Sequence, residues 1–179
     1  MSQFAARVSE ILDGNSAIIY TNFIDDIGPI VSELSEYVID CVAYHGEMDI
    51  QSRHTSYCKW RSGEIKVMVA TSAFGMGIDK PDIRNIIRYG VPENICSWVQ
   101  ELGRAGRDDL PSRATVFYSM SDTDHAGAWV KGNIHNYEAC DRILNGFSIA
   151  WKYVVSHLVH KCRRLTLLEL FGENVSTTD

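Results

Sequence analysis

Residues 65–82 read IKVMVATSAFGMGIDKPD, an apolar run that leads directly into a loop with two glycines. The run at 65–71 is rich in β-branched residues, as is typical of a buried strand. Similar short apolar runs predict four more strands, at 16–21, 39–44, 84–90 and 113–119. Helical spacing of apolar residues predicts helices between them, at 23–37 (with Pro29 in a first turn or at a kink), 49–60 and 94–102. This alternation predicts an α/β fold, a parallel sheet with helices on both faces.

The pattern changes near Ser121, where strand signals end and only helical patterns continue. Three helices are expected there, at 122–130, 137–159 and 165–171. A chain of 179 residues accommodates one ordinary domain plus an appendage. We therefore expect the sheet domain to be followed by a small helical extension.

Composition limits the classes of function. Hydrophobic residues make up 45% of the chain, and no apolar run approaches the roughly 20 residues of a membrane span. The net charge of −6 counts against nucleic-acid binding by bulk electrostatics, but permits contacts made by backbone amides and hydroxyls. Five scattered cysteines without a CxxC pair predict reduced thiols in an intracellular compartment.

The loop after the central strand carries groups suited to a phosphate ligand. Thr71 and Ser72 supply hydroxyls, Gly75 and Gly77 allow close backbone approach, and Asp79 can accept a hydrogen bond. Parallel sheets bind ligands at the loops that follow the strands. The alternative interpretation is an ordinary glycine-rich turn with Asp79 as a helix or turn cap.

A second segment, WVQELGRAGRD at 98–108, places two arginines three residues apart, each after a glycine. Arg104 and Arg107 stay ionised and offer planar forks of donors that match phosphate oxygens. The alternative is a helix C-terminus, where glycine ends the helix and arginine favours the negative end of the dipole.

Together the two segments resemble motifs V and VI of the RecQ family of DNA helicases, in helicase superfamily 2. The resemblance rests on AFGMGIDKPD at 73–82, QE at 100–101, GRAGRD at 103–108 and YHGEM at 44–48. It extends over about 16–171. It implies a RecA-like fold and the second of the two RecA-like lobes that clamp ATP in these enzymes.

The resemblance implies a role for each motif residue. Arg107 would be the arginine finger on the γ-phosphate, Arg104 would assist it, and Gln100 would link the nucleotide state to the lobe interface. Three further residues would lie beside the nucleotide: Asp79, Gly77 and Gly103. Four residues would face the DNA backbone: Thr71, Ser72, His45 and Gly46.

Other parts of such an enzyme are missing from the sequence. No GxxxxGK[ST] phosphate-binding loop and no Asp-Glu-x-His motif occurs in the 179 residues. ATP and Mg²⁺ are therefore expected to be held mainly by a first RecA-like lobe of the same polypeptide, outside this chain. We expect the chain to be a fragment that neither binds ATP tightly nor hydrolyses it alone.

The segment HKCRRL at 160–165 resembles the start of the zinc-binding subdomain that follows the second lobe. Cys162 matches the first of four cysteine ligands, and a closed Zn²⁺ site needs all four. Zinc is therefore expected in the full-length protein only. The predicted organisation is a lobe at 1–120, a helical linker at 121–160 and a truncated zinc module at 161–179.

The sequence as a whole predicts the C-terminal motor lobe of an ATP-dependent 3′–5′ DNA helicase that acts in repair and recombination. Such a protein would work in the nucleus, or in the cytoplasm if it is bacterial, with DNA as partner and no membrane. Two alternatives stay open: a non-catalytic scaffold or regulatory lobe, and a lobe of a superfamily 2 RNA helicase.

Overall fold

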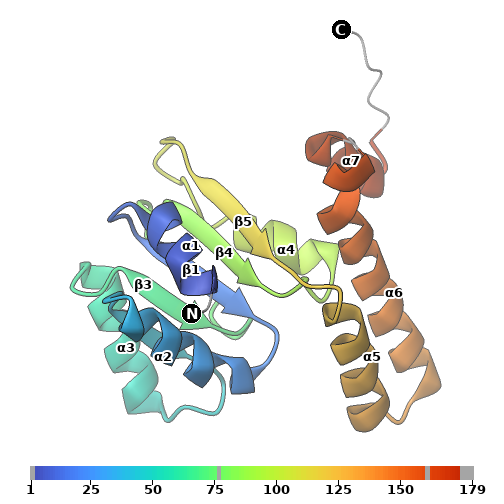
Figure 1. Ribbon diagram of the computed structural model, residues 1–179, viewed down its shortest axis with the longest axis horizontal. Helices are drawn as coiled ribbons and strands as arrows, with labels where there is room; N and C mark the ends of the chain where they lie inside the picture. The colour runs from blue at the N-terminus through green and yellow to red at the C-terminus, as the bar shows by residue number, and fades with distance from the viewer. Residues whose placement is uncertain (1–2, 76–77, 160–161, 174–179) are drawn as a thin grey trace, which may run out of the picture. The chain divides into compact units, whose positions relative to one another are not determined.

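The computed structural model describes residues 3–75, 78–159 and 162–173. A five-stranded parallel sheet lies at the centre of the larger of its two compact units, unit 1, which is Met1–Gly90 with Cys96–Ser119 (Figure 1). The strands are β1 (Ala17–Thr21), β2 (Cys41–Tyr44), β3 (Val67–Ala70), β4 (Asn85–Tyr89) and β5 (Arg113–Phe117). They lie in the order β2-β3-β1-β4-β5, and each neighbouring pair is parallel. Every observed strand falls within its predicted range, so the predicted α/β class is confirmed.

One face of the sheet is covered by α1 (Gln3–Leu12) and α2 (Ile27–Glu36). Alternate strand residues such as Ile19, Val69 and Ile87 form a single buried cluster with apolar side chains of these helices. Pro29 lies in the first turn of α2, which follows a 3₁₀ turn, η1 (Ile24–Asp26). Helix α2 therefore begins later than the predicted range at 23–37.

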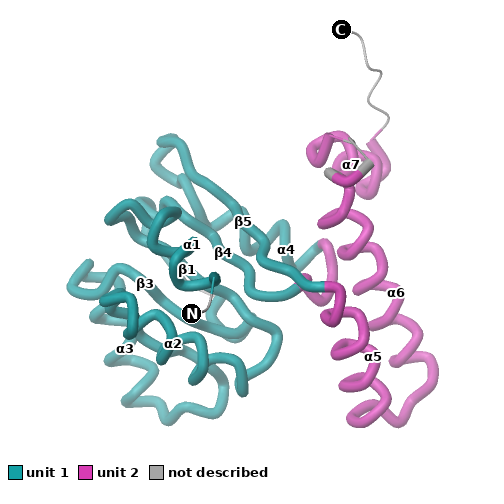
Figure 2. Tube along the Cα trace, in the orientation of Figure 1, with its two compact units in different colours: residues 1–90, 96–119 teal, residues 91–95, 120–179 magenta. Residues whose placement is uncertain are grey.

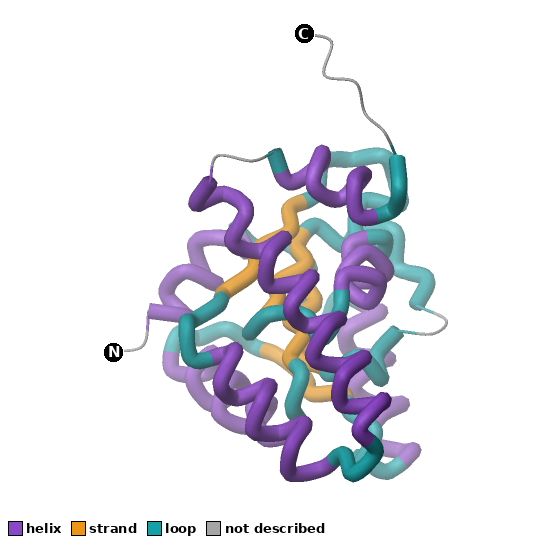
Figure 3. Tube along the Cα trace, turned by 90° about the vertical axis from the view of Figure 1, so that its right-hand side faces the viewer, coloured by secondary structure: helices purple, strands orange, loops and turns teal. Residues whose placement is uncertain are grey.

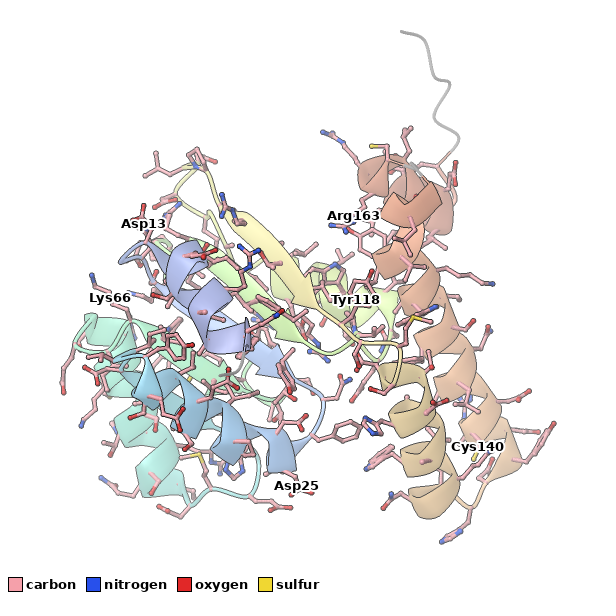
Figure 4. All side chains as sticks on the ribbon, in the orientation of Figure 1. Asp13, Asp25, Lys66, Tyr118, Cys140 and Arg163 are labelled. Atoms are coloured by element: carbon pink, nitrogen blue, oxygen red, sulfur yellow. The ribbon has the colours of Figure 1, made fainter. Side chains whose placement is uncertain are left out.

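Helix α1 is an element that the sequence analysis did not predict. Its buried residues Phe4, Val8 and Leu12 recur every four positions, with Ala5 on the same side. This is the spacing of one helical face, so the signal was present in the sequence. At the end of α1, Asp13 and Gly14 turn the chain with positive φ angles. Lys66, which is labelled together with Asp13 in Figure 4, lies just before β3. Its ammonium donates to the Gly14 carbonyl at 2.7 Å. That contact ties α1 to the amino end of β3.

The opposite face of the sheet carries α3 (Ile50–Ser62) and α4 (Ile95–Leu102). Trp60 of α3 is fully buried, and its indole N–H donates to the Ala17 carbonyl at 3.2 Å. Glu101 of α4 pairs with Arg88, which leaves β4 on the side opposite to its neighbour Ile87. The expectation of helices on both faces is therefore confirmed.

The contacts divide the chain into two compact units (Figure 2). Unit 1 is Met1–Gly90 with Cys96–Ser119, and unit 2 is Val91–Ile95 with Met120–Asp179. The described part of unit 2 consists of α5 (Asp122–Asn133), α6 (Tyr137–Val154), the 3₁₀ helix η2 (Val155–Val159), α7 (Arg163–Leu170) and loops (Figure 3). The expected single helix at 137–159 is thus two elements. The division into lobe, linker and zinc module stays a prediction.

None of the described helices combines the length and the apolar content that crossing a bilayer requires.

Two cysteines of unit 1 should differ sharply in reactivity. Burial, aided by the nearby charge of Asp40, raises the pKa of the Cys41 thiol to about 11, so at neutral pH it is protonated. Cys58 is exposed on α3. Because the thiolate is the nucleophile, we expect iodoacetamide at pH 8 to alkylate Cys58 faster than Cys41 by more than about tenfold. Peptide mass spectrometry after brief labelling measures both rates, and equal rates would contradict the described environment of Cys41.

Candidate functional site

The glycine-rich loop, residues 71–82, leaves the carboxyl end of β3 and is anchored through Phe74. The Phe74 ring is buried and packs against the rings of Tyr44 (4.7 Å between centroids) and Trp60 (5.3 Å). Tyr20 donates from its hydroxyl to the Phe74 carbonyl at 2.8 Å. Burial raises the pKa of Tyr20, which keeps this hydroxyl protonated and able to donate. The start of the loop is therefore fixed to β1, β2 and α3.

The arginine loop, residues 103–111, follows α4 and begins beside a buried ion pair. Arg88 on β4 donates from Nη1 to Glu101 Oε1 at 2.7 Å, and the two side chains are only 3% and 5% exposed. Arg88 also donates from Nη2 to the Asn22 side-chain oxygen. The end of α4, two residues before Gly103, is thus held against β4 and the segment after β1.

Both arginines of the arginine loop reach the glycine-rich loop. Arg104 donates from Nη1 to the Gly75 carbonyl, and Arg107 donates from Nη1 to the Ile78 carbonyl at 2.8 Å. A Cβ atom at Gly75 would lie 2.6 Å from Arg104 Nη2, so a side chain there would force the Arg104 guanidinium to move from its present position. The structure therefore brings the two segments singled out in the sequence into direct contact.

The two guanidinium groups are not equivalent. Arg104 is half-buried, and its Nε atom is buried without a hydrogen-bond partner in the part of the chain described. Arg107 is exposed, and its Nε donates to the Gly103 carbonyl at 3.2 Å. Arg107 is therefore the one of the two that can contact another molecule without leaving a buried position.

The four residues expected at a nucleic-acid backbone lie after two adjacent strands. His45 and Gly46 follow β2, Thr71 and Ser72 follow β3, and the Thr71 N–H donates to the Tyr44 carbonyl at 3.3 Å. Thr71 is buried, whereas Ser72 and Gly46 are exposed. The structure groups the four at one sheet edge and leaves Ser72 as the exposed hydroxyl.

The remaining predicted residues lie around the two loops. Gln100 on α4 and Asp79 are exposed, and in the described residues neither forms a hydrogen bond or ion pair with Arg104 or Arg107. Gly103 accepts from Arg107. Gly77 lies outside the described residues. The roles assigned to these residues stay predictions.

Residues 3–109 match the family described as "Helicase conserved C-terminal domain". The chain belongs to that family. It is 45% identical over 173 residues to a putative ATP-dependent DNA helicase Q1 of Caenorhabditis briggsae, over 97% of this chain and 26% of that protein. It is 35% identical over 164 residues to the ATP-dependent DNA helicase RecQ of Pasteurella multocida, over 90% of this chain and 25% of that protein. The helicase C-terminal domain and its extension thus span about a quarter of these relatives.

Solved structures share the fold. The Mycobacterium smegmatis helicase Lhr bound to ssDNA and AMP-PNP superposes with a TM-score of 0.59 at 23% identity, over 72% of this chain and 18% of that one. At this identity the likeness concerns the fold alone. The sheet of unit 1 therefore has the RecA-like arrangement of helicase C-terminal domains, as the sequence predicted.

Cys162 lies just before α7 and is exposed. Within residues 3–75, 78–159 and 162–173, no group of three or more His, Cys, Asp or Glu side chains could hold a metal ion. A closed zinc site needs four ligands, so the described part of this chain does not fit one. Zinc binding by the full-length protein stays a prediction.

A second ion pair of the helicase C-terminal domain was missed by sequence reasoning. Arg84, directly before β4, pairs with Asp108, directly after Arg107. The Arg84 hydrogen bond lowers the pKa of the Asp108 carboxyl. The stabilising effect of the pair is therefore present above the ordinary carboxyl pKa of about 4 and is lost as the pH falls through the lowered pKa. The detectable signal was the presence of two arginines, Arg84 and Arg88, four residues apart in and beside an apolar strand. An arginine that the strand draws wholly or partly out of water needs a partner.

Proposed function

We propose that this chain is the second RecA-like lobe of an ATP-dependent 3′–5′ DNA helicase of RecQ type, which acts in repair and recombination. The observation that carries the proposal is the contact of Arg104 and Arg107 with the glycine-rich loop at the carboxyl edge of the sheet. This arrangement presents the exposed Arg107 beside a loop suited to phosphate. The RecQ relatives support DNA as the nucleic acid.

In this proposal ATP and Mg²⁺ are held mainly by a first RecA-like lobe of the same polypeptide. This chain contributes Arg107 as the finger that offsets charge developing on the transferred phosphoryl group. Arg104 keeps the arginine loop against the glycine-rich loop, and Gln100, Asp79 and Gly103 lie around the nucleotide. The described residues fit the role of supplying the arginine finger, since Arg107 is an exposed cationic donor and no phosphate-binding loop is among them.

The DNA track of this lobe would run over the edge formed after β2 and β3. Ser72 and Gly46 offer an exposed hydroxyl and an unobstructed backbone to phosphate oxygens, and Thr71 and His45 lie beside them. His45 Nδ1 is buried and lacks a hydrogen-bond partner in the described structure. Glu47, next to Gly46, is exposed and would repel a phosphate, so the track would pass on the side away from it.

The proposal is tested by comparing this chain with the full-length parent protein. The parent should hydrolyse ATP faster with single-stranded DNA and should unwind a duplex with a 3′ tail but not one with a 5′ tail. The isolated 179 residues should show no ATP turnover above the blank, because Mg²⁺ and the phosphates lack their main ligands.

The same assays separate the alternatives. Unwinding of a matched RNA duplex but not of DNA would favour an RNA helicase. A parent without a GK[ST] motif and without turnover would favour a scaffold or regulatory lobe. Turnover by the purified 179 residues, free of contaminants, would overturn the proposed division of labour.

A further inference from the structure

We infer that Arg84 is a positioning residue that holds the arginine loop to β4 and thereby sets the place from which Arg107 extends. The part of the inference that concerns Arg107 rests on the proposed function. The part that says Arg84 fixes the arginine loop does not. It concerns a residue outside both segments that the sequence singled out.

The guanidinium of Arg84 gathers four oxygens. Nη2 pairs with Asp108 Oδ2 and lies 3.4 Å from the Pro81 carbonyl oxygen. Nη1 donates to the carbonyls of Leu110 (3.1 Å) and Pro111 (3.3 Å). A planar fork with several donors can serve such a set, whereas the single ammonium of lysine cannot. One side chain thus joins the end of the glycine-rich loop to the end of the arginine loop.

The backbone on both sides of Arg107 is held as well. The Gly106 N–H donates to the Ile83 carbonyl at 3.0 Å, and Asp109 N–H donates to the Gly106 carbonyl at 3.1 Å. Gly106 has a φ of +64°, and a Cβ there would lie 3.0 Å from the Leu110 carbonyl oxygen. The chain therefore turns tightly around Arg107, and Asp108 provides the side chain by which this turn is fixed to Arg84.

The exposure of Arg107 makes this support necessary. Its own hydrogen bonds are to two carbonyls of the loops, at Gly103 and Ile78, and a phosphoryl group would have to compete with them. An arginine that acts on a transferred phosphoryl group must lie in one place, since misplacement by ~1 Å can cost about 10²-fold in rate. Arg84, only 16% exposed, holds that place from the sheet side.

Hydrogen exchange in the 179-residue chain tests the hold. Arg84→Gln should speed exchange of the Gly106 and Leu110 amides by roughly tenfold, because it removes a charge-assisted hydrogen bond. Arg113→Gln, at an exposed arginine that starts β5, is the matched control and should leave both amides unchanged. Asp108→Asn removes the ionic partner and also alters the acceptor of the Leu110 N–H, which donates to Asp108 Oδ1 at 3.2 Å, so it is read at the Gly106 amide, where it should give a smaller increase. It also serves if Arg84→Gln does not fold. Unchanged exchange in both the Arg84 and Asp108 variants would overturn the inference.

Kinetics of the parent enzyme test positioning. Arg84→Gln should lower kcat for ATP about 10- to 100-fold with little change in KM, and Arg84→Lys should recover only part of that loss. A merely structural role would lower the folded fraction and leave kcat per folded molecule intact. Faster loop exchange with unchanged kcat would therefore overturn the positioning role. Failure of the proposed function itself would be recognised separately, from an inactive wild-type parent or an unaffected Arg107→Ala variant.

Discussion

Arg107→Ala in the full-length parent protein, as the proposed DNA helicase, is expected to lower kcat for DNA-stimulated ATP hydrolysis by about 10³- to 10⁵-fold. The physical reason is the loss of a cation that acts on charge developing in the transition state, equivalent to about 4–7 kcal/mol. Steady-state ATPase rates measure kcat, and nucleotide affinity measured by equilibrium titration should stay nearly unchanged. Affinity is retained because the main nucleotide ligands are expected in the other lobe.

The control for this prediction is Arg113→Ala, which removes an exposed arginine outside both loops. It should retain the turnover of the unaltered enzyme. Arg107→Lys should not restore the rate, because an ammonium lacks the planar fork of donors. Turnover like that of the unaltered enzyme in Arg107→Ala would exclude the finger role, whatever the other variants show.

Arg104→Ala should disturb the packing around the glycine-rich loop more than Arg107→Ala does. Both arginines donate to carbonyls of the glycine-rich loop, but Arg104 is half-buried whereas Arg107 is exposed, so only the loss of Arg104 leaves a partly buried gap beside Gly75. The sequence singled out Gly75 as a point of close backbone approach, with a ligand in mind. In the structure the group that approaches Gly75 is Arg104 of the same chain. The sequence therefore indicated a close approach at Gly75, but the group that makes this approach could be identified only from the fold.

The sheet could be predicted because its signals are local. Apolar runs bounded by turn residues marked all five strands, and their alternation with helices fixed the parallel arrangement. The helix at Gln3–Leu12 carried an equally local pattern in Phe4, Val8 and Leu12, so its omission was an error of interpretation. The break between α6 and η2 near Val155 had no such signal.

The side-chain contacts of the site could not be predicted in the same way. Arg107 meets Ile78 across 29 positions of sequence, and Arg84 meets Asp108 across 24. Such pairs depend on how strands and loops are placed beside one another. The sequence did indicate the chemical type of the partners, because an arginine in a buried strand needs an anion or carbonyl oxygens beside it.

Arg88→Ala is expected to lower the free energy of unfolding of unit 1 by about 3–5 kcal/mol, because Glu101 would stay buried after losing this cation. Such a loss is a large part of the stability of an ordinary domain, about 5–15 kcal/mol. Hydrogen exchange of the β1 and β4 amides under native conditions measures the change within unit 1. A second effect should accompany it: the start of the arginine loop loses its link to β4.

The matched control is Arg7→Ala, which breaks the exposed Arg7–Glu10 pair, whose side chains are 67% and 65% exposed. Surface pairs contribute about 0–1 kcal/mol, so this change should be small. The double variant Arg88→Met with Glu101→Leu removes both charges and should recover much of the stability lost in Arg88→Ala. If Arg88→Ala cost no more than Arg7→Ala, the buried pair would not be an ionic contact in solution. If the double variant recovered stability but not ATP turnover in the parent enzyme, the pair would act on the arginine loop as well as on the fold.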